Sequence, residues 1–175
     1  MSHPEQRQFL ARVKQEQPEF FEAQRVLEIG SLNINGTARD FFTDCDYTGV
    51  DLGPGDGVDV VGLGHEVAFD KPFDVALSCE CFEHNPHWAA TFLNMYKQVR
   101  AGGLIIVTCA TVGRAEHGTA RTSPQDAPLV PWDYYRNLVR EDFYDHFDIK
   151  AMFSTYAWNA NPISHDLNFW GLVKK

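Results

Sequence analysis

Short apolar runs alternate with polar, glycine-bearing turns through the middle of the chain. Five of these runs predict β-strands, which we place at residues 25–29, 47–52, 58–61, 73–78 and 104–108. The run at 73–78 is mostly apolar, as is typical of a parallel strand that is buried on both faces. Helical patterns separate several of the runs, and this alternation predicts an open α/β sheet.

Two helices are predicted around the first strand. Ser2 and Glu5 have the spacing of a capping box, Pro4 stands in the first turn, and an apolar stripe continues to about residue 16. This helix lies either across the mouth of a site formed by the sheet or along one sheet edge as a plain cover. A short helix is also expected over residues 37–42.

A third helix is predicted between the fourth and fifth strands. Asn85 can cap it, Pro86 fits its first position, and Gly102-Gly103 ends it. Its buried face consists of apolar side chains spaced by four, four and three residues, namely Trp88, Phe92, Tyr96 and Val99.

The last third of the chain has a different pattern. Residues 112–130 are rich in Gly, Thr, Ser, Pro and Arg and show no period, and so long a loop is usually functional or disordered. A helix is predicted over 132–139. Strands over 147–153 and 168–174, joined by a turn at 159–162, are expected to form an antiparallel pair.

Composition and charge narrow the classes of protein. The 175 residues, 44% of them apolar, suffice for one domain with one core. A net charge of −9 argues against nucleic acid or an anionic membrane as the main partner. No apolar run reaches the ~20 residues of a membrane span. The polar N-terminus lacks the layout of a secretion signal, so we expect a cytoplasmic protein.

The possible metal ligands have no recognisable pattern. The four cysteines lack the spacing of a zinc site. His84 and His87 lie three residues apart, and no third ligand is nearby in the sequence. The sequence therefore predicts no metal site.

The most informative motif is Glu28-Ile29-Gly30-Ser31, at the end of the first strand. An open α/β sheet presents small-molecule sites at the carboxyl ends of its strands. A phosphate site gains nothing from a carboxylate at this position, whereas a ligand with positive charge is favoured by it. S-adenosylmethionine, which carries sulfonium and ammonium groups, is such a ligand.

Within about residues 25–111 the chain has a series of motifs, namely Glu28-Ile29-Gly30-Ser31, Gly36, Gly49-Val50-Asp51, Phe73-Asp74-Val75, Glu83-His84 and Gly102-Gly103. In their order and spacing these motifs resemble the class I S-adenosylmethionine-dependent methyltransferases, and in particular the methyltransferase type 11 group. The resemblance implies a Rossmann-like fold. Its mixed sheet has seven strands in the order 3-2-1-4-5-7-6, with strand seven antiparallel and helices on both faces. It implies S-adenosylmethionine as the cofactor.

On this resemblance we divide the single domain, residues 1–175, into four parts. They are an N-terminal helix and linker (1–24), a cofactor-binding core (25–111), an acceptor-side loop and helix (112–146) and a closing β-hairpin (147–175).

Two departures from the family pattern stand out. Leu32 replaces the second glycine of the usual turn, and the loop to Gly36 is longer by about two residues. After the third strand the family often has an acid that faces the adenine amino group, whereas this chain has Gly62-Leu63-Gly64-His65.

The resemblance suggests roles for eight cofactor-binding residues. Glu28 would hold the ammonium end, Gly30 lets the backbone approach the ligand, and Asp51 can accept hydrogen bonds from both ribose hydroxyls. Leu52 either faces the adenine or packs in the core. The full set is Glu28, Gly30, Ser31, Gly36, Asp51, Leu52, Gly64 and Ser78.

The catalytic side carries fewer signals. Alignment can supply most of the acceleration of methyl transfer, and a base is needed only where the acceptor must lose a proton. His84 and His117 are the candidates, because imidazole titrates close to neutral pH. The alternative is that Glu83-His84 only closes the strand and that His117 belongs to an ordinary surface loop. The predicted acceptor pocket consists of Glu83, His117, Tyr134 and Tyr135.

The sequence thus favours a methyltransferase that acts on a small molecule. An NAD-dependent oxidoreductase would require Gly-x-Gly-x-x-Gly after the first strand, and that pattern is absent. A methyltransferase-like domain that binds without catalysis stays open as the second alternative. Neither the acceptor nor the oligomeric state is indicated.

Overall fold

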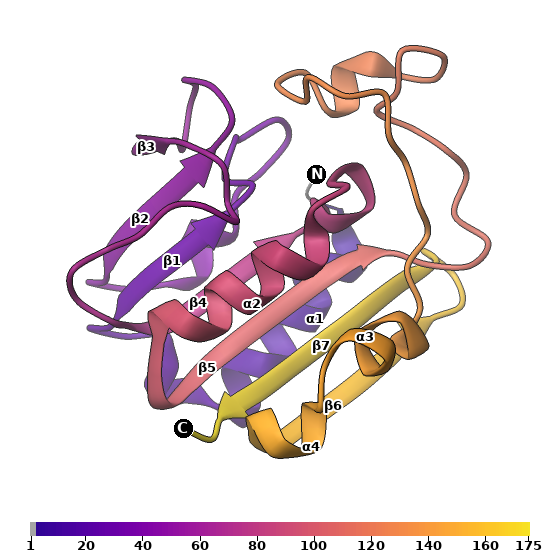
Figure 1. Cartoon of the computed structure of the whole chain (residues 1–175). Helices are drawn as coiled ribbons and strands as arrows, with labels where there is room; N and C mark the ends of the chain where they lie inside the picture. The colour runs from indigo at the N-terminus through magenta and orange to yellow at the C-terminus, as the bar shows by residue number, and fades with distance from the viewer. Residues whose placement is uncertain (1–2) are drawn as a thin grey trace.

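A sheet of seven strands forms the centre of the molecule (Figure 1). The structure, a computed structural model, describes residues 3–175. The strands are β1 (Arg25–Ile29), β2 (Asp46–Asp51), β3 (Val60–Val61), β4 (Phe73–Cys79), β5 (Val99–Ala110), β6 (Phe153–Asn161) and β7 (Asp166–Val173). Their order is β3-β2-β1-β4-β5-β7-β6, and β7 runs antiparallel to β5 and β6. The predicted order and directions are confirmed.

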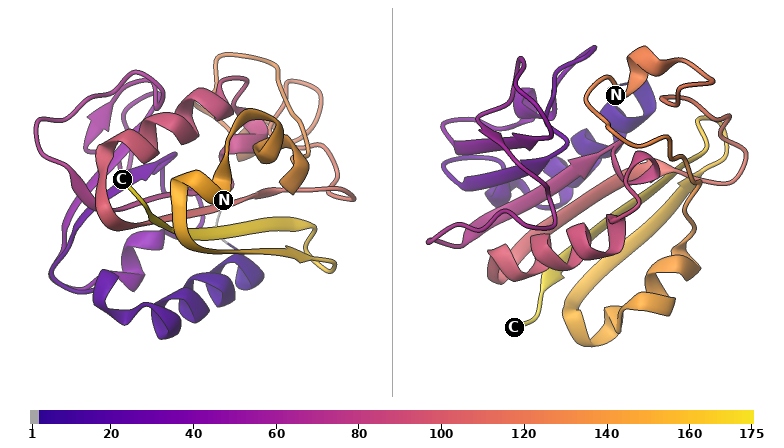
Figure 2. Two further views of the ribbon diagram at one scale, coloured as in Figure 1. Left: turned by 60° about the horizontal axis from the view of Figure 1, so that its bottom comes forward. Right: turned by 45° about the horizontal axis from the view of Figure 1, so that its top comes forward.

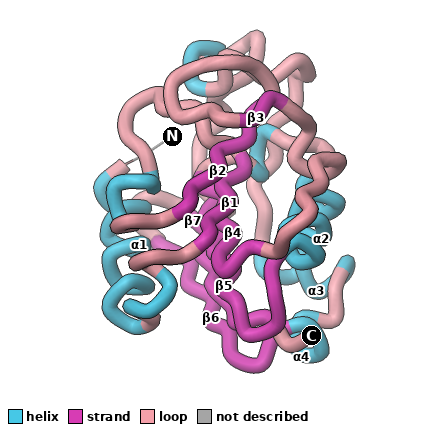
Figure 3. Tube along the Cα trace, turned by 90° about the vertical axis from the view of Figure 1, so that its left-hand side faces the viewer, coloured by secondary structure: helices cyan, strands magenta, loops and turns pink. Residues whose placement is uncertain are grey.

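Helices cover both faces of this sheet, as predicted. The α-helices are α1 (Pro4–Glu16), α2 (Trp88–Gln98), α3 (Arg140–His146) and α4 (Ile149–Met152). The 3₁₀ turns are η1 (Pro18–Phe20), η2 (Ala38–Phe41), η3 (Phe82–His84) and η4 (Pro124–Asp126). Figure 3 shows α1 on one side of the sheet and α2, α3 and α4 on the other. Among residues 3–175, no helix has the length and apolarity needed to cross a bilayer.

Strand alternation divides the core into two layers. In β4, Val75 and Leu77 belong to the cluster that includes Leu10 and Val13 of α1. Ala76, between them, belongs to the opposite cluster, beneath α2. Period-two alternation places neighbouring side chains on opposite faces, so an apolar run such as β4 is stable only where both faces are covered. Each fully buried large apolar side chain contributes about 1.5–3 kcal/mol.

The predicted helix over 132–139 is wrong. The chain is extended there, and α3 begins at Arg140. Two backbone hydrogen bonds explain the difference, because the amide of Arg136 donates to the carbonyl of Glu83 and that of Leu138 donates to the carbonyl of Ala110, both at 2.9 Å. These bonds to remote carbonyls hold the segment against the sheet and replace helical bonds.

The closing hairpin begins later than predicted. Residues 147–152 do not extend the strand, because the side chain of Asp148 accepts a hydrogen bond from the amide of Ala151 and caps α4. The first strand of the hairpin, β6, therefore starts at Phe153. The antiparallel pairing itself is confirmed.

The helix between β4 and β5 also differs at both ends. His87 stands at the N-cap of α2, and Asn85 instead accepts a hydrogen bond from the amide of His87 at 2.8 Å. At the other end α2 stops at Gln98, and Gly102-Gly103 lies inside β5.

The N-terminal elements largely agree with those predicted from the sequence. α1 ends at Glu16 as predicted, with His3 at its N-cap, whereas Ser2 lies outside the described residues. The helix predicted over 37–42 is the single 3₁₀ turn η2, capped by Thr37.

Candidate functional site

The turn after β1 depends on Gly30. Its φ of +83° favours glycine, and a Cβ at this position would lie 2.7 Å from the Cβ of Cys81. The amide of Gly30 donates to the carbonyl of Val50 at 2.9 Å. The turn is thereby held tightly between β2 and the end of β4.

The carboxylate of Asp51 joins two turns at this edge of the sheet. One oxygen accepts a hydrogen bond from the amide of Leu32 at 2.9 Å, and the other accepts one from the amide of Leu52 at 2.7 Å. A carboxylate has about four acceptor positions, so each oxygen can still accept a further bond from a ligand. The bond from Leu32 uses its backbone amide and does not depend on the side chain. Leucine can therefore occupy the position at which the family has glycine.

A cleft opens beside these turns, at the carboxyl ends of β1, β2 and β4. Its space, counted together with the solvent at its open side, is about 720 Å³. Five predicted site residues line it, namely Gly30, Asp51, Leu52, Gly64 and His84. The long segment between β5 and α3 extends beyond the sheet (Figure 2), and its residues 126–130 together with Trp132 form one wall of the cleft.

The charged side chains that line this cleft are mostly acidic. They include Asp51, Glu80 and Asp126, and in the part of the chain that the structure describes no lysine or arginine is among them. Glu80 follows β4 with a φ of +51°, and neither of its oxygens accepts a hydrogen bond. The imidazole Nε2 of His3 lies 3.7 Å from its carboxylate. The cleft therefore favours a ligand with positive charge.

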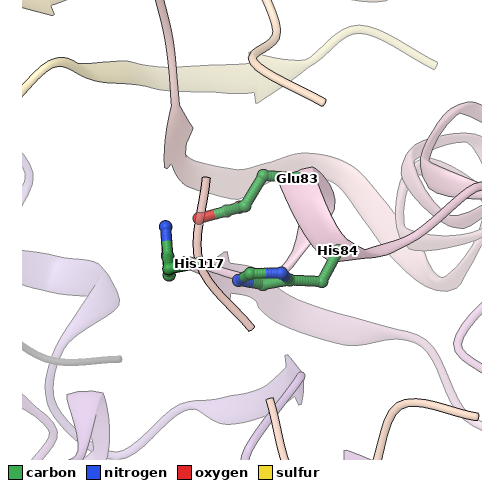
Figure 4. A group of neighbouring side chains, drawn as sticks. All are labelled: Glu83, His84 and His117. Atoms are coloured by element: carbon green, nitrogen blue, oxygen red, sulfur yellow. The ribbon is translucent and has the colours of Figure 1, made fainter. Parts of the chain in front are cut away.

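Beside the cleft, Glu83, His84 and His117 form a compact group (Figure 4). The rings of His84 and His117 lie 4.9 Å apart, and the ring of Tyr135 packs against both, at 5.6 and 5.0 Å between centroids. Tyr134 is half-buried, and the structure gives it no ring contact with this group among residues 3–175.

Burial controls the protonation of the group. Burial, together with the imidazole of His117, lowers the pKa of His84 to about 3, so the ring is neutral at physiological pH. A ring with so low a pKa is a weak base, which weakens the prediction that His84 acts as a general base. Burial, together with the negative charge of Glu80, raises the pKa of Glu83 above its usual value.

Comparison with known proteins gives matches only at the level of structure. No protein-family model matches the sequence, and no curated protein does. The 1,6-didemethyltoxoflavin N1-methyltransferase of Burkholderia thailandensis superposes with a TM-score of 0.66 at 16% identity, over 97% of this chain and 78% of that one. N-methyltransferase NodS of Bradyrhizobium japonicum gives 0.63 at 13% identity, over 98% and 86%.

Phosphoethanolamine N-methyltransferase 2 of Haemonchus contortus gives a TM-score of 0.64 at 19% identity, over 96% of this chain but only 52% of that protein. The strand order and the antiparallel β7 agree with these matches. The chain has the class I methyltransferase fold. At such low identities the similarity establishes the fold alone.

Within this methyltransferase fold, Glu28 does not line the cleft. Its carboxyl group is buried and accepts a hydrogen bond from the hydroxyl of Tyr47 at 2.8 Å. Burial raises the pKa of Glu28 to about 7, although the bond from Tyr47 opposes the shift. A contact between Glu28 and a cofactor stays a prediction.

Three other predicted cofactor residues also lie outside the lining of the cleft. The hydroxyl of Ser78 donates to the carbonyl of Ile29 at 2.8 Å and so joins β4 to β1. Ser31 is buried, and Gly36 is exposed in the loop that follows. The contact of all three residues with a ligand stays a prediction.

Part of the cleft is not predicted by the sequence. Trp132 falls in the helix predicted over 132–139, but its indole nitrogen donates to the carbonyl of His84 at 2.5 Å and the residue lines the cleft. Leu129 packs against Gly53 across the opening. The length of the 112–130 segment was the only signal, because its sequence has no period.

Proposed function

We propose that the protein is an S-adenosylmethionine-dependent methyltransferase that acts on a small molecule. The observation that carries this proposal is the cleft at the ends of β1, β2 and β4, whose lining in the described part of the chain includes Asp51, Glu80 and Asp126 and no lysine or arginine. The ligand that this arrangement favours is cationic. S-adenosylmethionine combines a cationic methionyl end with ribose hydroxyls that a carboxylate can bind.

The cofactor would lie along the cleft in one orientation. Asp51 accepts hydrogen bonds from the ribose hydroxyls, while Leu52, Leu63 and Leu129 offer apolar surface to the adenine. The carboxyl group of Glu80 lines the cleft and would face the positive methionyl end, and the imidazole of His3, 3.7 Å away, balances part of its charge. Gly30 lets the backbone come close to the ligand.

Methyl transfer from a sulfonium is a displacement on an already activated carbon, so positioning supplies most of the acceleration. Correct alignment of two reactants corresponds to effective molarities of up to about 10⁵–10⁸ M. Leu129 and Trp132 belong to the segment that covers the cleft and limits the access of water. The acceptor would approach beside His84, where Glu83, His117 and Tyr135 form the predicted acceptor side.

Two structural neighbours support a small acceptor. The structure of the 1,6-didemethyltoxoflavin N1-methyltransferase holds 1,6-didemethyltoxoflavin, and that of the phosphoethanolamine N-methyltransferase holds phosphomonomethylethanolamine. The net charge of −9 agrees with a partner other than nucleic acid. A cytoplasmic location remains part of the proposal and rests on the sequence.

The alternatives differ in their ligands. An NAD-dependent oxidoreductase would need a pyrophosphate site, and the acidic lining of the cleft opposes one. The dinucleotide-binding fold also has the strand order 3-2-1-4-5-6 without an antiparallel strand inserted beside strand five. A non-catalytic domain would bind S-adenosylmethionine without releasing S-adenosylhomocysteine.

Calorimetric titration with candidate cofactors separates a methyltransferase from an NAD-dependent oxidoreductase. We expect S-adenosylmethionine and S-adenosylhomocysteine to bind and NAD to fail. Asp51→Ala removes two ribose contacts worth about 1.5–3 kcal/mol in all, a loss of about 10- to 160-fold in affinity. Asp46→Ala, an exposed acid at the other end of β2, serves as the control and should bind normally. Binding of NAD but not of S-adenosylmethionine would overturn the proposal.

Catalysis is tested separately, by S-adenosylhomocysteine release in the presence of a pool of small metabolites. Release that depends on the pool and falls in Asp51→Ala supports an enzyme. Cofactor binding without release from any pool supports the non-catalytic alternative.

A further inference from the structure

We propose that Glu83, His84 and His117 bind a divalent transition-metal ion at the acceptor side of the cleft. One ligand atom from each residue lies within 4.8 Å of the other two. In Figure 4 the carboxyl group of Glu83 extends toward His117, and the ring of His84 points to the same place. An ion about 2.0–2.2 Å from each atom needs them within about 4.4 Å of one another, so a shift of a few tenths of an ångström suffices.

The polar atoms of this group lack partners. Glu83 is fully buried, and neither of its carboxyl oxygens has a hydrogen-bond partner among the described residues. The Nδ1 atom of His84, a residue 5% exposed, also has none. A buried carboxylate without compensation is costly, so the charged form of Glu83 would be stabilised by a cation at this place.

A second cluster of similar composition shows the contrast. His3, Glu80 and Asp166 also lie close enough to share an ion. There, however, Asp166 accepts hydrogen bonds from Arg114 at 3.2 Å and from Ser164 at 2.5 Å, and His3 lies 3.2 Å from its carboxylate. Side chains of the protein already balance that charge, whereas around Glu83 they do not.

The surroundings of the two imidazoles suit metal ligands. The Nδ1 atom of His117 lies 3.0 Å from the carbonyl oxygen of Ala115, an arrangement that fixes one tautomer and leaves Nε2 for an ion. Tyr135 packs against both rings and holds their orientation. Glu80 adds negative charge near Glu83, which favours a dication over a neutral ligand.

Two imidazoles and one carboxylate are the donor set of catalytic zinc sites and of several iron, manganese and cobalt sites. Three protein ligands leave at least one position open. Because His84 also lines the cleft, that position is accessible to a ligand there. If the proposed function holds, a hydroxyl group of the acceptor would occupy it, and coordination would lower the pKa of that hydroxyl.

The test is direct titration of metal into the full-length protein. After treatment with a chelator, wild-type protein is titrated with Co²⁺, followed by visible absorption, and with Zn²⁺, followed by calorimetry. We expect one ion per chain. Glu83→Gln and His117→Ala should each weaken binding by at least about tenfold, and the exposed residue His146→Ala should not change it.

The half-buried position of His117 keeps the test valid if Glu83→Gln folds poorly. No saturable binding to the wild type, or equal affinity in His117→Ala, would overturn the proposal. A loss of methyl transfer in His117→Ala without any metal binding would also overturn it, and would indicate an acid–base pair instead. S-adenosylhomocysteine titrated in parallel reports on the proposed function independently of the metal.

Discussion

The carboxylate of Asp51 binds the backbone amide of Leu32 at 2.9 Å, so the end of β2 fixes the turn that follows β1. The same carboxylate binds the amide of Leu52 at 2.7 Å. One side chain therefore orders two turns that line the cleft before any ligand arrives. Such preorganisation reduces the entropy that binding must overcome.

Asp51→Ala should accordingly destabilise the free protein as well as weaken binding. The amides of Leu32 and Leu52 lose their acceptor, and we expect a loss of about 1–3 kcal/mol in the free energy of unfolding. Chemical denaturation measures it. Asp46→Ala on the same strand is exposed and should change stability by less than about 0.5 kcal/mol. Equal losses in both variants would contradict the role of Asp51 in the turns.

Gly30→Ala should be more costly than an ordinary substitution at positive φ. At Gly30 the new methyl group would meet Cys81 at 2.7 Å in addition to the backbone strain. Gly102→Ala is the matched control, because its φ is +70° but the nearest atom to a Cβ there is the flexible end of Arg100 at 3.6 Å. We expect about 1 kcal/mol of destabilisation for Gly102→Ala and at least about 1 kcal/mol more for Gly30→Ala. Thermal or urea unfolding distinguishes the two, and equal values would show that the contact with Cys81 relaxes freely.

The turn at Gly30 also shows how much of the structure the sequence could predict. The strands and the ligand-binding edge follow from local signals, because apolar runs and the Gly30 turn are determined by neighbours in the chain, whereas the strand order was implied by the family resemblance. The extended segment around Leu138 could not be predicted, since its bond to Ala110 joins residues that are distant in sequence. The sequence did place Glu83, His84 and His117 on the acceptor side, but it predicted no metal site, because His117 is distant from the other two in the chain.

Leu129→Ala tests the wall formed by the loop. Leu129 packs against Gly53 and lines the cleft, yet it belongs to neither core cluster. We expect the variant to keep its stability within about 1 kcal/mol while its affinity for S-adenosylhomocysteine falls several-fold, because part of the apolar wall is lost. Calorimetry and thermal unfolding on the same preparation check both statements. Unchanged affinity would place the adenine away from this wall.

His3 makes the stability depend on pH in the alkaline range. Burial disfavours the charged ring, but the neighbouring carboxylates of Asp166 and Glu80 outweigh it and raise the pKa of His3 from 6.5 to about 10. The folded state therefore holds this proton more tightly than the unfolded chain. The stabilisation is complete below about pH 6.5 and disappears as the pH rises through about 10.

His3→Asn keeps a residue suited to the N-cap of α1 and removes the imidazolium. The wild type should exceed the variant in free energy of unfolding by about 1–3 kcal/mol at pH 6, and the excess should vanish near pH 10. Urea unfolding at a series of pH values measures the difference. A constant difference across this range would show that His3 is neutral in the folded protein.

Glu28 should also make the stability depend on pH, but in a lower range: its ionisation destabilises the folded protein. Burial raises the pKa of Glu28 from 4.5 to about 7, so the folded state resists its ionisation. The resulting loss of stability is absent below pH 4.5, grows between pH 4.5 and 7, and is constant above that range.

Glu28→Gln keeps an oxygen that can accept the hydrogen bond from Tyr47, but its side chain cannot ionise. The stability of this variant relative to the wild type should therefore rise by about 3 kcal/mol across the same range. Glu19→Gln, at an exposed position, should follow the wild type throughout. Parallel curves for Glu28→Gln and the wild type would mean that Glu28 is ionised in the folded protein well below neutral pH.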